Sequence, residues 1–447
     1  MRRTAIVLTM VLSTICSHAQ QMTLQQCLDS ALTYNRRIIS ARLDLTSAKE
    51  QRKDAFTNYF PEVSANIMAF HSMDKMIKGN GTYPDELSML GEPYSRLSGQ
   101  PYSIEELNKG YSAAITLTMP LYAGGQITTG NRLAKIQEDV TDIRMRMTEK
   151  DVTQNVTECY WQLACLQYKL NTLYSAEKLV DALHQQVEQY VRNGVTTRND
   201  LLKIDIRKKE IEGNKVRLTS AINVMTLSLA NQIGMNVHDI TIDVNDTRDI
   251  DLPTYADSRA TAEKRDELLM AERNVEAKKN EVSMQRAKSM PKVAVGVSAY
   301  HSGFGGISET IKRNIDTKMT NGVVFGTMSI PISEWWSGSH GMRQKKALHK
   351  KAENEYEEIR ESLCVDIENA WSEVLSAYKQ YEISRSAVTQ TEENLRIMTE
   401  QYKAGTTHIT DLLDAEALNR QAHDEESQAK ASYQIKLNDY KRKTNEI

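Results

Sequence analysis

Two long stretches of the chain repeat apolar side chains at alternating spacings of four and three residues. In each stretch, ten of twelve such positions are apolar or aromatic, and the second set lies 211 residues after the first. The exceptions are Glu177 and His184 in the first set and Ser384 and Thr391 in the second. The first set comprises residues 152, 156, 159, 163, 166, 170, 173, 177, 180, 184, 187 and 191. This spacing is the seam of a coiled coil. It predicts helices at 126–191 and 338–402, each roughly 100 Å long at 1.5 Å per residue.

Four shorter stretches alternate apolar with small or polar residues, which is typical of strands with two different faces. We expect strands at 62–72, 111–122, 292–302 and 322–333. An apolar face opposite a small polar face fits a transmembrane strand between lipid and water. It also fits a half-buried sheet in a soluble domain. Aromatic side chains near the strand ends favour the membrane interpretation, because such rings gather at membrane interfaces. These aromatics are Tyr59, Phe60, Tyr111, Tyr122, Tyr300, Trp335 and Trp336.

The second half of the chain repeats the plan of the first, which indicates a duplication. An offset of 211 residues places Pro120 on Pro331 and Gly194 on Gly405 without a gap, and upstream an offset of 230 places Pro61 on Pro291. We therefore expect two structural repeats, each with a first helix, a β-hairpin, a long helix and a return helix. The repeats span 20–233 and 261–447, joined by a linker at 234–260. Their first helices are expected at 22–58 and 261–289, their hairpins at 61–122 and 291–333, and their return helices at 198–233 and 409–445.

The N-terminus has the features of a secretory signal peptide at 1–19. Arg2 and Arg3 precede a short apolar run, and small residues precede a cut near Gln20. The run is too short to span a bilayer as a helix. A lipid anchor on Cys16 is the alternative, but Ile15 stands where a small residue is usual. A signal peptide predicts export from the cytoplasm.

The remaining composition excludes several classes of protein. The formal net charge is -3. The sequence has no basic stripe with interleaved aromatics, the pattern that would indicate nucleic-acid binding.

Cys159 and Cys165 are six residues apart in a predicted helix. This is about 9 Å by helical rise, which is too far for a disulfide. His71, Met73 and Met76 offer soft metal ligands, yet apolar packing is the simpler explanation. No catalytic motif is present, so we expect no enzyme activity, no cofactor and no metal site.

Four membrane strands cannot close a sheet on themselves, and lipid does not tolerate open sheet edges. Three copies of the chain would supply twelve strands for a closed barrel. The long helices would then continue as a helical tube. The competing hypothesis is a periplasmic coiled-coil scaffold or adaptor without a pore, which needs no membrane strands.

Short motifs along the mature chain resemble those of the TolC-like outer-membrane efflux protein family. Met22-Thr23-Leu24 resembles its opening motif, and Lys264-Arg265-Asp266-Glu267-Leu268 resembles its "NRPEL", with Asp266 in place of proline. Pro120-Leu121-Tyr122-Ala123-Gly124-Gly125 resembles its strand exit, and Tyr402-Lys403-Ala404-Gly405 with Asp411-Leu412-Leu413-Asp414-Ala415 its hairpin tip. The resemblance implies a mainly helical homotrimer in the outer membrane of a Gram-negative bacterium, with a 12-stranded transmembrane β-barrel and an α-helical periplasmic tunnel. It also implies export of drugs, toxins or proteins, a periplasmic adaptor (membrane fusion protein) and an inner-membrane pump.

The resemblance further implies that an adaptor docks on the two hairpin tips, around 191–198 and 402–408. These tips contain Gly194 with Thr196 and Gly405 with Thr407. A helix-capping role alone would also explain the two glycines.

The resemblance places Asp411, Asp414 and Asp200 at the narrow end of the tunnel, where symmetry-related copies form an acidic ring that attracts cations. Favourable charge near a helix N-terminus is the simpler explanation for the same residues. Tyr402 matches a family gate residue whose hydrogen bonds hold the closed state. Two departures weaken the ring and its closing ion pair: Lys203 stands opposite Asp414, and Thr407 replaces the usual basic residue, with His408 beside it.

Overall fold

The computed structural model describes residues 21–73, 78–82, 101–105, 107–235, 241–242, 250–308 and 313–446. The expected signal peptide at 1–19 and part of the expected linker at 234–260 lie outside these residues. The chain forms two compact units, which we describe separately. The first unit comprises Met1–Lys49, Gln137–Glu276 and Lys351–Ile447, and the second comprises Glu50–Ile136 and Ala277–Lys350.

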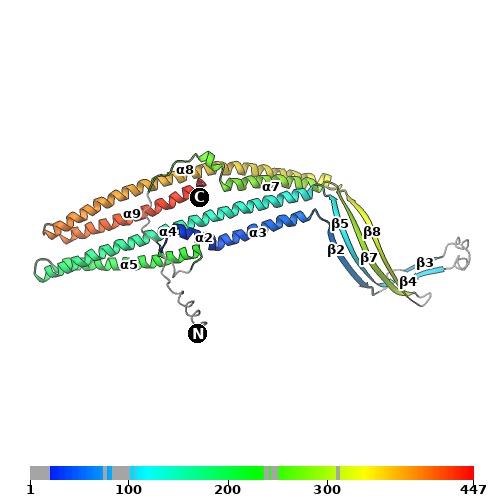
Figure 1. Cartoon of the computed structure of the whole chain (residues 1–447), viewed down its shortest axis with the longest axis horizontal. Helices are drawn as coiled ribbons and strands as arrows, with labels where there is room; N and C mark the ends of the chain where they lie inside the picture. The colour runs from blue at the N-terminus through cyan, green and yellow to red at the C-terminus, as the bar shows by residue number, and fades with distance from the viewer. Residues whose placement is uncertain are drawn as a thin grey trace, which may run out of the picture. The chain divides into compact units, whose positions relative to one another are not determined.

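The second unit contains a four-stranded antiparallel sheet in the order β2-β5-β7-β8 (Figure 1). The strands are β2 (Glu62–His71), β5 (Leu107–Tyr122), β7 (Lys292–Ser308) and β8 (Arg313–Ser329). Each repeat contributes one hairpin, and β5 pairs with β7 across the repeats. A second ladder pairs β3 (Lys78–Thr82) with β4 (Pro101–Glu105), within the stretch expected to be a loop.

The register of the sheet collects the apolar positions of all four strands on one face. Cross-strand neighbours share a face of an antiparallel sheet, and one such row joins Val63, Leu117, Val297 and Val324. The adjacent row on the opposite face contains Ser64, Thr116, Ser298 and Val323. There the Thr116 and Ser298 hydroxyls are 2.9 Å apart. The sheet therefore has one aliphatic face and one mixed polar face.

Two long helical hairpins lie mostly in the first unit, and their first helices begin in the second (Figure 1). Helix α4 (Gln126–Arg192) returns as α5 (Arg198–Ile233), and α8 (Glu334–Lys403) returns as α9 (Ile409–Lys443). The shorter helices are α2 (Leu24–Tyr34), α3 (Arg36–Thr57), α6 (Ser258–Ala262) and α7 (Asp266–Lys288), and β1 (Gln21–Met22) pairs with β6 (Thr241–Ile242). Within the described residues, no helix is both long enough and apolar enough to cross a bilayer.

The four–three seam of the long helices is the side that packs. Val152, Val156, Leu163, Val180 and Val187 are each at most 1% exposed. Burying one such side chain stabilises the fold by about 1.5–3 kcal/mol. The seam therefore holds each long helix against its neighbours, as the pattern predicts.

The polar exceptions in the seam make specific contacts. Glu177 accepts a 2.7 Å hydrogen bond from Lys215 of α5, and His184 Nε2 lies 3.1 Å from Asp205. In the second repeat, the Thr391 hydroxyl lies 3.3 Å from Asn419 Oδ1 of α9. Three of the four exceptions thus connect a long helix to its own return helix. The fourth, Ser384, donates to the Tyr381 carbonyl of its own helix.

The first helix, expected as one element at 22–58, is broken at Asn35 into α2 and α3. The Asn35 amide donates a 2.6 Å hydrogen bond to the Gln232 carbonyl, and its Oδ1 accepts from the Arg37 amide. An asparagine side chain that forms hydrogen bonds with nearby backbone groups competes with the hydrogen bonds of the helix.

Two helices of the second repeat begin at other residues than expected. Helix α7 begins at Asp266 rather than at 261, and α8 begins at Glu334 rather than at 338.

Asp266, which replaces the proline of the family motif, joins α7 to α4. It is 6% exposed, accepts a 2.8 Å hydrogen bond from Arg146 and lies 3.1 Å from Lys150. Proline suits the first position of a helix because its missing N–H is not needed there. Aspartate suits the same position through the helix dipole. The substitution therefore keeps the helix start and adds two ion pairs.

Cys27, Cys159, Cys165 and Cys364 are all free thiols. Cys27 and Cys165 are buried in one apolar cluster with Val156 and Tyr160. Burial raises the pKa of the Cys27 thiol to about 11. Such a thiol is protonated at neutral pH and behaves as a small apolar side chain.

Candidate functional site: the tips of the two helical hairpins

Both hairpin tips use the same backbone arrangement, with a glycine in the left-handed conformation. Gly194 has φ +73° and Gly405 has φ +71°. The amide after each glycine donates to the carbonyl five residues earlier, Val195 to Tyr190 at 2.8 Å and Thr406 to Gln401 at 3.0 Å. This is the Schellman cap, which satisfies the last carbonyls of a helix. The local function of both glycines is therefore to end α4 and α8.

Two residues before each return helix stands a threonine that donates to an aspartate four residues further along the chain. Thr196 donates to Asp200 and Thr407 donates to Asp411, at 2.8 and 2.9 Å. The aspartates also hold the helix start, since Asp200 accepts from Thr197 and Asp411 accepts from the His408 amide. Residues that lie 211 positions apart in the two repeats thus make equivalent side-chain contacts.

Hydrogen bonds from the threonines lower the pKa of both carboxyls. Thr196 has the largest effect on the pKa of Asp200, and Thr407 has the largest effect on that of Asp411. Both aspartates are consequently ionised at neutral pH. They stabilise the helix starts and present negative charge at the same time, so the two explanations considered for them are compatible.

Asp414 and Tyr402 differ from these capping residues. The Asp414 side chain is exposed, and it has no hydrogen bond or ion pair with any residue in the described part of the chain. Tyr402 packs partly buried against the apolar cluster of the tip, which includes Val187 and Leu412. Burial, with smaller effects of Tyr190 and Asp200, raises the Tyr402 pKa. Tyr402 is therefore held here by packing.

Polar side chains of α5 tie the first tip to the second. Lys203 donates a 2.8 Å hydrogen bond to the Thr410 hydroxyl and lies 3.6 Å from Asp200. One turn further on, Arg207 donates two hydrogen bonds to Glu416 Oε2, at 2.9 and 2.6 Å. The two hairpins of one chain are thus joined side by side close to their tips. We call these contacts, Lys203–Thr410 and Arg207–Glu416, the α5–α9 clasp.

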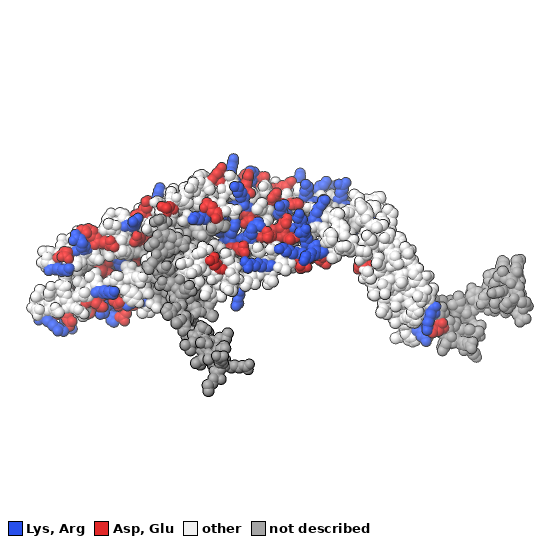
Figure 2. Space-filling model, viewed as in Figure 1, with Lys and Arg blue, Asp and Glu red and all other residues white. Residues whose placement is uncertain are grey.

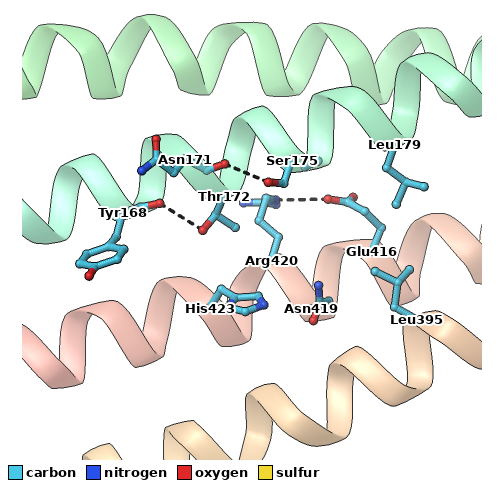
Figure 3. Close-up of a pocket in the computed structure, with 11 residues that line it drawn as sticks. Tyr168, Asn171, Thr172, Ser175, Leu179, Leu395, Glu416, Asn419, Arg420 and His423 are labelled. Carbon is cyan, nitrogen blue, oxygen red and sulfur yellow. Dashed lines mark hydrogen bonds and ion pairs between the residues drawn. The ribbon is translucent and has the colours of Figure 1, made fainter. Parts of the chain in front are cut away.

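A cavity of about 300 Å³, lined by apolar and polar side chains, lies beside the clasp, between α4, α8 and α9. Figure 3 shows Glu416 and Arg420 projecting from α9 toward α4. Glu416 is 2% exposed, and its Oε1 has no hydrogen-bond partner among the described residues but lies 3.9 Å from Arg420 Nε. A space of this size has room for several water molecules, at about 30 Å³ each. Hydration would complete the partners of the buried carboxylate.

The residues of the expected gate and docking sites lie at or next to the two tips, whereas the clasp has no signature in the sequence. Lys203 departs from the expected acidic ring, and no motif marks Arg207 or Glu416. When two opposite charges are about two hundred residues apart, the sequence around either one does not show that they will form a contact. Only the packing of α5 beside α9 shows it. Among the described residues, no group of three or more His, Cys, Asp or Glu side chains could hold a metal ion.

A family model described as outer membrane efflux protein matches residues 27–234 and 258–442. The chain belongs to this outer membrane efflux protein family. The match agrees with the motif resemblance and covers both repeats. It decides between the two hypotheses, because members of this family are outer-membrane channels rather than soluble scaffolds.

Individual relatives are distant but align over nearly the whole chain. The proteases secretion protein PrtF of Dickeya chrysanthemi is 20% identical over 431 residues, which is 93% of this chain and 86% of PrtF. The CmeC outer membrane channel of Campylobacter jejuni has a TM-score of 0.75 at 14% identity, covering 94% of this chain and 85% of CmeC. The open state of the MtrE outer membrane channel of Neisseria gonorrhoeae has a TM-score of 0.71 at 16% identity, covering 94% and 88%. At these identities the structures establish the fold.

Family and fold together define the role of the chain. It is a channel of the outer membrane of a Gram-negative bacterium, and its helical part extends into the periplasm. The four-stranded sheet is accordingly the part that meets the membrane. The hairpin tips belong to the periplasmic part.

Proposed function

We propose that three copies of this chain form the passive export duct of a tripartite efflux or type I secretion system. A periplasmic adaptor and an inner-membrane pump would complete the system. The observation that supports assembly with further copies is the sheet. Among the described strands of one chain, β2 and β8 are the two edges of the order β2-β5-β7-β8, and each pairs on one side. Unpaired backbone groups are costly in lipid, so β2 of one copy must pair with β8 of the next. Three sheets of four strands then close as twelve.

We propose that the adaptor docks on the two hairpin tips, around Gly194 with Thr196 and Gly405 with Thr407. The support is their near-identical geometry, because one adaptor motif could recognise both tips of each chain. In a trimer this arrangement would present six similar sites. The exposed side chain of Val195, at 70%, adds apolar surface at the first tip.

We propose that the tips also form the periplasmic gate, with Asp411 and Asp414 contributing the accessible negative charge of the second tip. Both side chains are exposed, whereas Asp200 is partly buried and Lys203 offsets part of the charge in the first repeat. Three copies of Asp414 would make one acidic ring, which favours cations over anions in the pore. Tyr402 supports the closed tip by packing, and the α5–α9 clasp keeps the two hairpins of each chain together.

Single-channel conductance of the detergent-purified protein in a planar bilayer tests this proposal. Small, stable, cation-preferring openings are expected, and Asp414→Asn and Asp411→Asn should each shift the reversal potential toward zero. Asp205→Asn is a matched control, because it removes a half-exposed charge of α5 that already pairs with His184. Failure to insert, together with solubility without detergent, would refute the duct. A reversal potential unchanged in Asp414→Asn would refute the acidic ring alone.

A further inference from the structure

The aliphatic face of the sheet is a continuous band without ionisable groups. Its sixteen positions are Val63, Ala65, Ile67, Ala69, Ala113, Ile115, Leu117, Met119, Val293, Val295, Val297, Ala299, Gly322, Val324, Gly326 and Met328. Several are strongly exposed within the single chain, including Ile67 at 84% and Val324 at 79%. The face of the sheet visible in Figure 2 carries charged side chains only near its two ends. In an outer-membrane channel, such a band contacts the acyl chains of the lipid.

The band changes character at the end of the sheet away from the helices. There the rows of cross-strand neighbours contain His301 with Thr320, then Tyr111 with Lys318, then His71 with Lys109 and Asp316. We call these seven residues the loop-end cluster. They come from all four strands and lie on the same face as the aliphatic band. Because the helices are periplasmic, this end of the sheet faces the outer leaflet.

Side-chain contacts hold the loop-end cluster together. The Tyr111 hydroxyl lies 3.2 Å from His301 Nε2, and His301 Nδ1 lies 2.7 Å from the Thr320 hydroxyl. A Cβ at Gly303 would lie 2.5 Å from the Tyr111 ring, and one at Gly305 would lie 2.6 Å from Lys109 Cε. The two glycines of β7 therefore leave space in which Tyr111 and Lys109 lie flat along the sheet. The two glycines of β7 thus determine where these polar side chains can lie.

The charge of the cluster is net positive. Lys109 and Lys318 are exposed, and the one carboxylate of the cluster, Asp316, lies 3.8 Å from Lys318 at exposures of 65% and 61%. Lys109 forms no ion pair within the part of the chain that the structure describes. The helix-bearing end of the same unit is different. It carries the exposed neutral rings Phe56, Phe60, Tyr122, Trp335 and Trp336.

We propose that the loop-end cluster binds the phosphate of the anionic glycolipid in the outer leaflet. Lysine ammonium groups and a tyrosine hydroxyl make charge-assisted hydrogen bonds to phosphate oxygens. The aliphatic band directly beneath them receives the acyl chains of the same molecule. A free phosphate ion would use only the polar half of this surface, so the paired band and cluster identify a lipid. His301 holds the Tyr111 hydroxyl in place, and Lys109 and Lys318 supply the charge.

The experiment compares thermal unfolding of the purified full-length protein in neutral phosphatidylcholine nanodiscs with and without bisphosphorylated lipid A. Lipid A should raise the Tm of the wild type and of Lys292→Gln, which neutralises an exposed lysine at the opposite end of the sheet. In Lys109→Gln/Lys318→Gln the rise should fall at least three-fold, and Lys109→Arg/Lys318→Arg should restore it. Because the Tm shift is measured within each variant, a general loss of stability does not obscure the result.

Three outcomes would overturn the proposal. An equal Tm rise in the double glutamine variant would show that the lysines do not bind the lipid. An equal rise with fully dephosphorylated lipid A would show that the acyl chains alone bind. An equal rise with inorganic phosphate in lipid A-free nanodiscs would show a general anion effect rather than recognition of a lipid.

Discussion

Lys203 of α5 donates a 2.8 Å hydrogen bond to the hydroxyl of Thr410 in α9, although the two residues are 207 positions apart. The contact joins the start of the first return helix to the start of the second. If the tips must separate for the duct to open, this contact opposes opening. A hydrogen bond of this kind contributes about 1 kcal/mol.

Lys203→Met and Thr410→Val are both expected to favour the open state. A loss of about 1 kcal/mol corresponds to a few-fold increase in the open-to-closed ratio measured by single-channel recording. Both variants break the hydrogen bond, but Thr410→Val keeps the charge of Lys203. If both variants increase opening equally, the lost hydrogen bond, and not the lost charge, is the cause. Lys209→Met serves as a control, because Lys209 pairs only with Glu212 of its own helix in the described structure. Open times that match this control would exclude a role for the contact in closing the tip.

The second part of the clasp should matter for stability. Arg207 and Glu416 are 11% and 3% exposed at their side chains and 2.6 Å apart. Removing one partner of a buried ion pair typically costs about 3–5 kcal/mol, because the other charge is left buried. Arg207→Met should therefore lower the thermal midpoint clearly, and Arg207→Met/Glu416→Leu should recover much of the loss.

Arg396→Met provides the comparison for this effect. Arg396 pairs with Glu393 on the surface of α8, with exposures of 65% and 54%, and such pairs contribute about 0–1 kcal/mol. Thermal unfolding of the detergent-solubilised variants measures both changes. If Arg207→Met unfolds at the same temperature as Arg396→Met, the Arg207–Glu416 pair does not stabilise the tip.

The long helices could be predicted from sequence because the residues that specify them repeat at regular spacings along the helices themselves. The seam residues Val152 and Val187 repeat over many turns, and glycines mark where α4 and α8 end. The break at Asn35 could not be predicted in this way, since neither glycine nor proline is present there. Its cause is a hydrogen bond to the Gln232 carbonyl, nearly two hundred residues away. The clasp has the same origin, because it depends on which face of α5 packs beside α9.

The two tip glycines are expected to resist substitution for reasons of backbone conformation. A Cβ at Gly194 or Gly405 would meet no atom within 4 Å, so overlap is not the obstacle. A residue with a Cβ in the left-handed region costs about 1–2 kcal/mol, most of all when it is β-branched. Gly405→Val should therefore destabilise the tip and reduce export, whereas Gly405→Asn should retain most of it, because asparagine tolerates this conformation.

Gly213 is the matched control for these substitutions. It lies inside α5, also with no atom within 4 Å of a Cβ, and it does not need a positive φ. Gly213→Ala should stabilise the protein by about 0.5–1 kcal/mol. Thermal midpoints and an export assay in cells distinguish the cases. Normal export and stability in Gly405→Val would show that the left-handed cap is dispensable.

Asp424 of α9 should make stability depend on pH in the opposite sense to the tip aspartates. Burial raises its pKa above the ordinary carboxyl value, although Lys169, Arg420 and His423 act against this shift. Its Oδ1 has no hydrogen-bond partner in the described part of the chain. A carboxyl with a raised folded-state pKa favours folding when protonated, and this contribution is lost as pH rises through that pKa.

Asp424→Asn should therefore raise the thermal midpoint at neutral pH, by removing the cost of a buried charge. The gain should shrink as pH falls toward the ordinary carboxyl pKa, where the wild-type group is protonated as well. Asp411→Asn should behave in the opposite way, since hydrogen bonds lower the pKa of Asp411 and its stabilising effect is present at neutral pH. Midpoints measured for both variants over a range of pH test the two signs together. A constant gain for Asp424→Asn at every pH would mean that packing, rather than ionisation, causes the change.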